Sequence, residues 1–305
     1  MSKPKSFWGN LSIFTLLLLL VASCILCMSL AHDRAMTLVH PGRSLPQRNP
    51  SDVGLNSWMD VRFPSTDGLQ LGAWFIPVDS EEPSPILIYV HGLGSNREGL
   101  LDQAQLFYAH GYSALLIDLR NHGGSQGEIT TLGFHEVMDV EGAVSFLLDQ
   151  DDIDPDRIGL IGESMGGAVV IRAAARIPII KATVAECTYT SLEDNVEQGV
   201  RALTGLPPFP FAPLVVWFGE RETGADITLV RPIDDLDQIP PRSIMFIHGE
   251  QDPIVDVNNS RNLYEAASEP KEILIIPNAG HGGLMNKNPG LFQSRVVDFL
   301  NTYLK

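Results

Sequence analysis

Cysteine is scarce in this sequence. Of 305 residues only three are cysteines, and two of them, Cys24 and Cys27, lie in one apolar N-terminal segment. Cys187 alone remains for the rest of the chain, so an intramolecular disulfide framework is excluded there. Zinc-binding spacings, a Walker loop and a G-x-G-x-x-G dinucleotide turn are also missing. We therefore expect no metal and no organic cofactor.

Basic residues are also few, with 21 Lys and Arg against 37 Asp and Glu and a net charge of −16. This balance argues against a nucleic-acid partner and against a broadly basic membrane-binding face. Hydrophobic residues make up 44% of the chain and charged residues 19%, which allows a sizeable core and argues against general disorder. The length suits one large α/β domain or two small ones.

Charge is absent from Leu11 to Ala31, a run of 21 residues that would span about 30 Å as a helix. A cleaved signal peptide and a lipoprotein signal ending at Cys24 are the competing interpretations. The apolar run continues for seven residues beyond Cys24, which favours an uncleaved signal anchor over residues 1–31.

Lys3 and Lys5 precede this run and predict a cytoplasmic N-terminus. The expected protein is therefore single-pass in a membrane, with its main domain on the extracytoplasmic side. Three arginines beyond the run, Arg34, Arg43 and Arg48, weaken the charge asymmetry behind this orientation.

Residues 32–56 are rich in proline and glycine and predict a flexible tether, and residues 57–305 predict one α/β domain. Short apolar runs there alternate with amphipathic stretches, which is typical of a mostly parallel sheet flanked by helices. Asp67-Gly68 predicts a hairpin. We expect about eight strands: Trp58–Phe63, Leu69–Val78, Ile86–Val90, Ser113–Asp118, Ile158–Ile161, Ala182–Glu186, Ile244–His248 and Glu272–Ile276.

An insertion over about residues 191–240 interrupts this rhythm. The prolines between Gly205 and Phe218 argue against one regular helix there. The insertion predicts a small cap. This cap is either a lid or acyl-binding wall, or a segment that only packs on the core.

The segment Gly162-Glu163-Ser164-Met165-Gly166 follows a short apolar strand and precedes a helix-forming run. It matches G-x-S-x-G, the nucleophile elbow, in which flanking glycines permit a tight turn that exposes the serine. An ordinary helix-capping serine is the alternative interpretation of this segment taken alone.

A nucleophilic serine needs a base and a group that orients the base. His281 follows the last predicted strand and Asp252 follows the strand before it, so the chain order is Ser, Asp, His. Asp256 and Glu250 are the second choices for the acid. Asp252 is preferred because Asp256 lies where the next helix begins and suits a helix cap.

Acyl transfer also needs donors for the developing oxyanion, and the backbone N–H groups of Leu93 and Met165 are the candidates. Gly92 and Gly94 would allow a close backbone approach. His91 and His122 are expected to order the surrounding loops. His248, at the end of a buried strand, is expected to be a hydrogen-bonded core residue.

Five motifs together resemble the α/β-hydrolase superfamily of serine hydrolases: His91–Gly94, Asp118–Ser125, Gly162–Gly167, His248–Asp252 and Gly280–Gly282. The resemblance extends from Trp58 to the C-terminus and is strongest to membrane-anchored, esterase- or peptidase-like members. It implies the α/β-hydrolase fold, with Ser164, Asp252 and His281 as the catalytic residues.

The leading function is cleavage of a carboxylic ester or thioester through an acyl-enzyme on Ser164. An aminoacyl or peptide amide hydrolase is the nearest alternative, and a non-catalytic binding protein of the same fold is another. The expected partners are a small-molecule or acylated substrate and a lipid bilayer; the sequence does not determine the oligomeric state.

Overall fold

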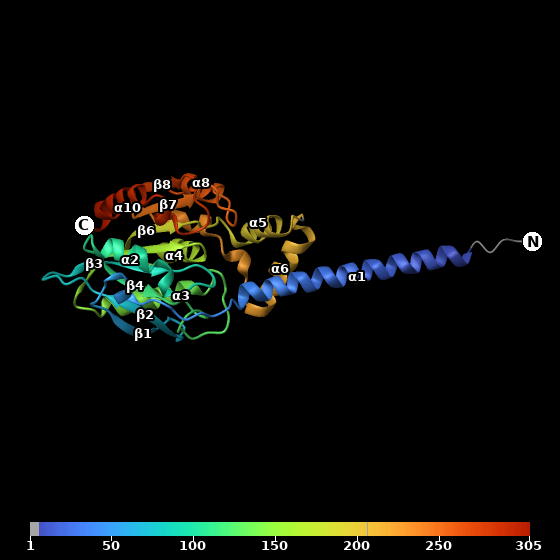
Figure 1. Cartoon of the computed structure of the whole chain (residues 1–305), viewed down its shortest axis with the longest axis horizontal. Coiled ribbons are helices and arrows are strands. Elements are labelled where there is room, and N and C mark those ends of the chain that lie inside the picture. Colours follow the sequence, from blue (N-terminus) through green and yellow to red (C-terminus); the bar gives the residue numbers. More distant parts are fainter. Residues whose placement is uncertain (1–5, 206) are drawn as a thin grey trace, which may run out of the picture.

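One sheet of eight strands forms the centre of the computed structural model, which describes residues 6–205 and 207–305 (Figure 1). Its order is β1-β2-β4-β3-β5-β6-β7-β8. β2 pairs antiparallel with β1 and β4, and the other pairs are parallel. The strands are β1 Met59–Pro64, β2 Gln70–Ile76, β3 Ser84–Val90, β4 Ser113–Ile117, β5 Ile153–Glu163, β6 Ile180–Glu186, β7 Ser243–Gly249 and β8 Lys271–Ile276.

Helices cover both faces of the sheet, which confirms the predicted α/β-hydrolase fold. Along β3, Ile86 and Ile88 join the core cluster that holds α3 (Glu136–Leu148), α4 (Met165–Arg176) and α8 (Asn258–Ala266). Leu87 and Tyr89 join the opposite cluster, with α2 (Leu101–Tyr108) and α10 (Pro289–Leu304). Because side chains alternate along a strand, a continuous apolar run is needed where both faces are covered.

The parallel strands place their carboxyl ends along one edge of the sheet. β3, β5, β7 and β8 lead there into the loops that carry the predicted site residues. These loops converge although they lie far apart in the sequence.

Helix α1 runs from Ser6 to Val39 and extends away from the sheet (Figure 1). Its Ile13–Val39 part is long and apolar enough to cross a membrane, and it fits either an anchor or a signal sequence. Lys3 and Lys5, on which the predicted orientation depends, lie outside the described residues.

Residues 32–56, expected to form a flexible tether, contain regular structure at both ends. α1 continues to Val39, and a short 3-10 helix, η1, follows at Pro50–Val53. Between them the backbone is held by the main domain: Glu98 accepts N–H bonds from Gln47 and Arg48, and Asn96 donates to the carbonyl of Ser44. Proline and glycine made the segment irregular, and side chains from distant loops fix it.

The insertion contains α5 (Leu192–Thr204), α6 (Pro208–Thr223), η3 (Ile227–Leu229), α7 (Pro232–Asp235) and η4 (Leu236–Gln238). The argument against a regular helix was wrong for most of α6, where only Phe209 has non-helical backbone angles. Pro208 and Pro210 fall in the first turn, where an N–H has no intrahelical partner to lose, and Pro213 lies inside the helix. Leu206, between α5 and α6, lies outside the described residues.

Candidate active site

Ser164 occupies the turn between β5 and α4 with φ 57° and ψ −116°, a conformation that non-glycine residues rarely adopt. Its N–H donates to the carbonyl of Glu186 at 2.8 Å. A Cβ on Gly166 would lie 2.0 Å from the carbonyl oxygen of Val90, and one on Gly162 2.2 Å from that of Gly166. Both positions therefore require glycine, as the elbow motif predicts.

His281 lies between the serine and the aspartate. Its Nε2 is 2.9 Å from Oγ of Ser164, and its Nδ1 is 2.7 Å from Oδ2 of Asp252. The carboxylate only accepts, so Nδ1 carries the proton and Nε2 is free to accept the serine proton. The imidazole is 15% exposed and the carboxylate is fully buried, which leaves the base accessible and its orienting group protected from water.

Asp252 is held as a carboxylate by donors on several sides. Oδ1 accepts the N–H groups of Ile254 and Val255 at 2.8 and 3.0 Å. Burial alone would raise the pKa of Asp252, but hydrogen bonds from His248, His281 and Val255 outweigh it and hold the pKa well below its usual value. It therefore stays charged at neutral pH.

The two other acids considered for this role are engaged elsewhere. Oδ1 of Asp256 accepts the N–H of Asn258 at the start of α8, and Glu250 accepts the N–H of Asn278. The structure thus brings Asp252, the preferred choice, to His281.

Gly92 brings the loop after β3 against the nucleophile, since a Cβ added there would lie 3.3 Å from Cβ of Ser164. Leu93 follows directly, and Met165 is the first residue of α4. Within the residues that the structure describes, neither the N–H of Leu93 nor that of Met165 donates to another group. Both are thus available to stabilise a negatively charged oxygen.

Two neutral histidines fix this loop. Nε2 of His91 accepts the N–H of Leu119 at 3.1 Å, and Nε2 of His122 accepts that of Gly94 at 3.1 Å. Burial lowers the pKa of His91 to about 3, with a smaller contribution from His122, and burial also lowers the pKa of His122. Both rings therefore act as hydrogen-bond acceptors at neutral pH and order the loop.

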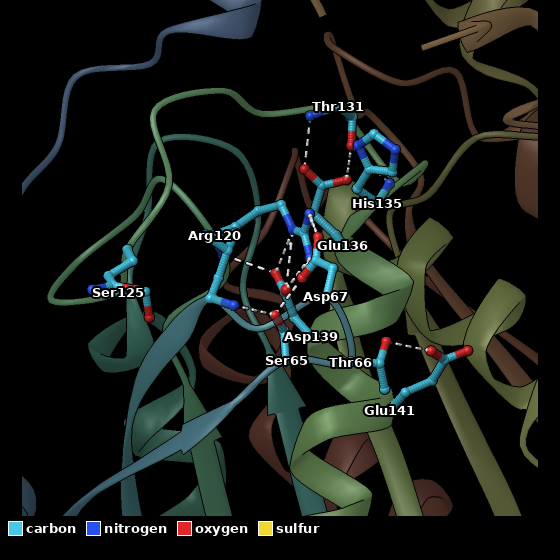
Figure 2. Close-up of polar contacts among 12 residues, drawn as sticks. Ser65, Thr66, Asp67, Arg120, Ser125, Thr131, His135, Glu136, Asp139 and Glu141 are labelled. Carbon is cyan, nitrogen blue, oxygen red and sulfur yellow. Dashed lines mark hydrogen bonds and ion pairs between the residues drawn. The ribbon is translucent and has the colours of Figure 1, made fainter. Parts of the chain in front are cut away.

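The loop that carries His122 is fixed in turn by Arg120, which lies between two carboxylates (Figure 2). Its guanidinium donates to Asp67 at 2.8 Å and to Asp139 at 2.7 Å, and its N–H donates to Asp139 at 2.8 Å. The backbone carbonyl of Arg120 is 2.9 Å from Nδ1 of His122. A continuous set of contacts thus connects this buried ion pair with Gly94.

The sequence did not predict that two groups beside the elbow, Glu186 and Cys187, are buried with shifted pKa values, or that the pKa of the partly buried Glu163 is raised. Glu186 is fully buried, and burial first, then the nearby Glu163, raises its pKa to about 8. Burial also raises the pKa of Glu163 and of the Cys187 thiol, so Cys187 remains a neutral thiol beside Asp252 and His281. No local pattern marks these residues, because only the fold removes them from water.

A polar cleft of about 390 Å³ begins at Leu93. Leu93 to Asn96 form one side, and Ser44 and Arg48, from the segment after α1, contribute to another. The guanidinium of Arg48 is held by Glu98 at 3.0 Å and Asp102 at 2.9 Å. Ser44 and Arg48, from the segment expected to form a tether, therefore line the cleft beside Leu93, a candidate oxyanion donor.

This strand order, with a serine, a histidine and an aspartate joined at the carboxyl edge of the sheet, defines an α/β-hydrolase. The chain belongs to the alpha/beta hydrolase family, which it matches over residues 87–292.

Relatives extend over most of the chain. It is 29% identical to YqkD of Bacillus subtilis over 241 residues, covering 78% of each protein. It is also 29% identical to Rv2307c of Mycobacterium tuberculosis over 280 residues, 91% of this chain and 89% of that one. Among solved structures, the esterase Pf2001 of Pyrococcus furiosus aligns with a TM-score of 0.73 at 26% identity, covering 88% of this chain and 100% of the esterase. The family match and the likeness to the esterase support a hydrolase.

Proposed function

We propose that this protein is a serine hydrolase that cleaves a carboxylic ester or thioester through an acyl-enzyme on Ser164. The observation that carries the proposal is the unbroken series of hydrogen bonds from Ser164 to His281 to Asp252, at 2.9 and 2.7 Å. Serine is a weak nucleophile at neutral pH, and this arrangement supplies both a base and a group that orients it.

In the first half of the reaction, Oγ of Ser164 attacks the carbonyl carbon while Nε2 of His281 takes the hydroxyl proton. The carbonyl oxygen becomes an oxyanion, which the N–H groups of Leu93 and Met165 stabilise. Asp252 stabilises the imidazolium that forms. When the carbon–oxygen or carbon–sulfur bond breaks, His281 returns the proton to the leaving alcohol or thiol.

The second half repeats these roles with water. His281 takes a proton from the water as its oxygen attacks the acyl carbon, and the same two N–H groups hold the new oxyanion. Collapse releases the carboxylic acid, and His281 returns the proton to Oγ of Ser164. No other group has to change its protonation state.

Two observations favour an ester or thioester over an amide. The esterase Pf2001, at 26% identity, aligns along its whole length. The cleft that begins at Leu93 is polar and lined by Ser44, Arg48 and Asn96, which suits a leaving group that carries hydroxyls. We further propose that α1 is retained as a single-pass anchor, with the hydrolase domain on the extracytoplasmic side.

Substrate class is tested by comparing kcat/KM for p-nitrophenyl esters of short and long acyl chains, matched thioesters, and aminoacyl p-nitroanilides. We expect the esters or thioesters to be cleaved fastest, and the p-nitrophenyl esters to give a burst of p-nitrophenol as the acyl-enzyme accumulates. Faster cleavage of the anilides than of every ester would contradict the ester assignment and favour an amide hydrolase.

A further inference from the structure

The cap helix α6 packs along the end of α1. One face of α1 becomes covered at every fourth residue, with Cys27 partly buried and Ala31, Ala35 and Val39 buried. Ala212 and Val215 of α6 belong to the same core cluster as Ala31. The covered face therefore begins inside the uncharged run of α1, which ends at Ala31.

Two contacts fix the relative direction of these helices. The ring of His32 stacks edge-on against Phe218 at 5.1 Å, and Nε2 of His40 lies 2.8 Å from Glu222. Both helices therefore advance in the same general direction, and the start of α6 lies on the side of the His32–Phe218 contact away from His40. At 1.5 Å per residue, Pro210 lies about 12 Å from Phe218 along the α6 axis, on the side away from Glu222. In Figure 1, α5 and α6 lie beside the C-terminal part of α1, and the turn that joins them lies on the side away from the sheet.

The uncharged segments of α1 and α6 end at the same level. Ala202 to Gly219 is an uncharged run of 18 residues, followed by Glu220, Arg221 and Glu222. On α1 the uncharged run is followed by His32-Asp33-Arg34. His32 and Phe218, whose rings are in contact, lie where the uncharged run of each helix ends. The uncharged parts of α1 and α6 therefore lie on the same side of this contact.

Two large apolar side chains of α6 face outward. Phe209, near the hairpin tip, is 76% exposed, and Trp217, next to the boundary, is 47% exposed. The guanidinium of Arg221 lies over the Trp217 ring at 5.7 Å, where the apolar surface ends. An aromatic with a cation at an apolar–polar boundary is typical of a membrane interface.

We propose that the tip of the α5–α6 hairpin, led by Phe209, inserts into the same lipid leaflet as the end of α1. We assign a lipid bilayer as the partner of this surface. The exposed apolar surface of the hairpin tip continues the apolar surface of α1, and the membrane-spanning part of α1 is not covered by the rest of the protein. This inference depends on the proposed anchoring by α1. The cap then rests on the membrane, and the hydrolase domain is held at a fixed height above it.

The test places an environment-sensitive fluorophore on single cysteines in the full chain, after Cys24→Ser and Cys27→Ser remove the reactive thiols of α1. Phe209→Cys reports on the hairpin tip and Leu19→Cys on α1. Leu229→Cys is the matched control, since Leu229 is 56% exposed in the same insertion but follows the charged end of α6. The background without an added cysteine measures any labelling of buried Cys187.

Each variant is reconstituted into phosphatidylcholine vesicles with or without nitroxide-labelled lipid. We expect positions 19 and 209 to emit at shorter wavelength and to be quenched several-fold more strongly by the nitroxide lipid than position 229. If position 209 is quenched no more than position 229 while position 19 is strongly quenched, the proposed membrane contact of the cap is wrong. If position 19 is quenched no more than position 229, both the proposed membrane anchor and this inference are wrong. Fluorophosphonate labelling of Ser164 in the same samples reports separately on the proposed chemistry.

Discussion

Nε2 of His248 lies 3.2 Å from Oδ2 of Asp252, on the same oxygen that accepts the hydrogen bond of His281. It is also 2.9 Å from the carbonyl oxygen of Val255. Both neighbours only accept, so Nε2 carries the proton, and Nδ1 accepts from the hydroxyl of Ser260 at 2.7 Å. The expected core role of His248 is therefore accompanied by a direct contact with the candidate catalytic acid.

Replacing His248 should weaken the support of Asp252. We expect His248→Phe to lower kcat by about tenfold, which corresponds to roughly 1.4 kcal/mol, a typical loss for a hydrogen bond to a charged group. KM should change little, because His248 lies behind the carboxylate. Ser260→Ala, which removes only the partner of Nδ1, is the control and should lower kcat much less. An unchanged kcat in folded His248→Phe would contradict the assigned role.

Two glycines should respond oppositely to the same substitution. Gly166→Ala should destabilise the fold by about 3 kcal/mol or more, because its Cβ would overlap the carbonyl of Val90. Gly199→Ala, in the middle of α5 with open space around it, should stabilise by roughly 0.5–1 kcal/mol. Denaturant unfolding measures both changes. Equal effects at the two positions would show that crowding at the elbow is not what requires glycine.

The sequence predicts the sheet and the elbow well because their signals are local. Gly162 and Gly166 are needed by a turn only a few residues long, and Asp252 and His281 each directly follow an apolar strand. The contact of His248 with Asp252 was not predicted, because an Asp four residues after a buried histidine has no fixed direction outside a helix. The packing of α6 on α1 joins segments such as those of His40 and Glu222, which are 182 residues apart, and leaves no short-range pattern.

Glu186 should make stability depend on pH. Its pKa is raised to about 8 by burial and by Glu163, whereas in the unfolded chain it is near the ordinary value of about 4.5. Between these values the folded protein holds a proton that the unfolded chain has lost, so stability falls as pH rises and the penalty is complete above about pH 8.

We therefore expect Glu186→Gln to raise the free energy of unfolding at pH 9, by on the order of a few kcal/mol, and to change it much less at pH 5. Glu197→Gln, on the exposed face of α5, is the matched control and should show no such dependence. Chemical denaturation across this pH range measures the difference. A gain that is the same at both pH values would rule out titration of Glu186 as the cause.

The ion pair beneath the loop of His122 should matter for stability. Asp139→Asn leaves the buried guanidinium of Arg120 without its fully buried partner and should lower Tm by roughly 10 °C. Asp67→Asn removes the partner that is 36% exposed, and its effect should be several-fold smaller. Calorimetry measures both. A larger effect at Asp67 would reverse the assigned importance of the two carboxylates.

The most direct test of the proposed chemistry is covalent labelling by a fluorophosphonate, followed by peptide mass analysis. The wild-type protein should be labelled on Ser164, since His281 activates that hydroxyl and the N–H groups of Leu93 and Met165 stabilise the charge that develops on the phosphoryl oxygen. Ser164→Ala should remain folded and should not be labelled. Labelling that persists in Ser164→Ala, or a folded wild-type protein that does not react, would contradict the account.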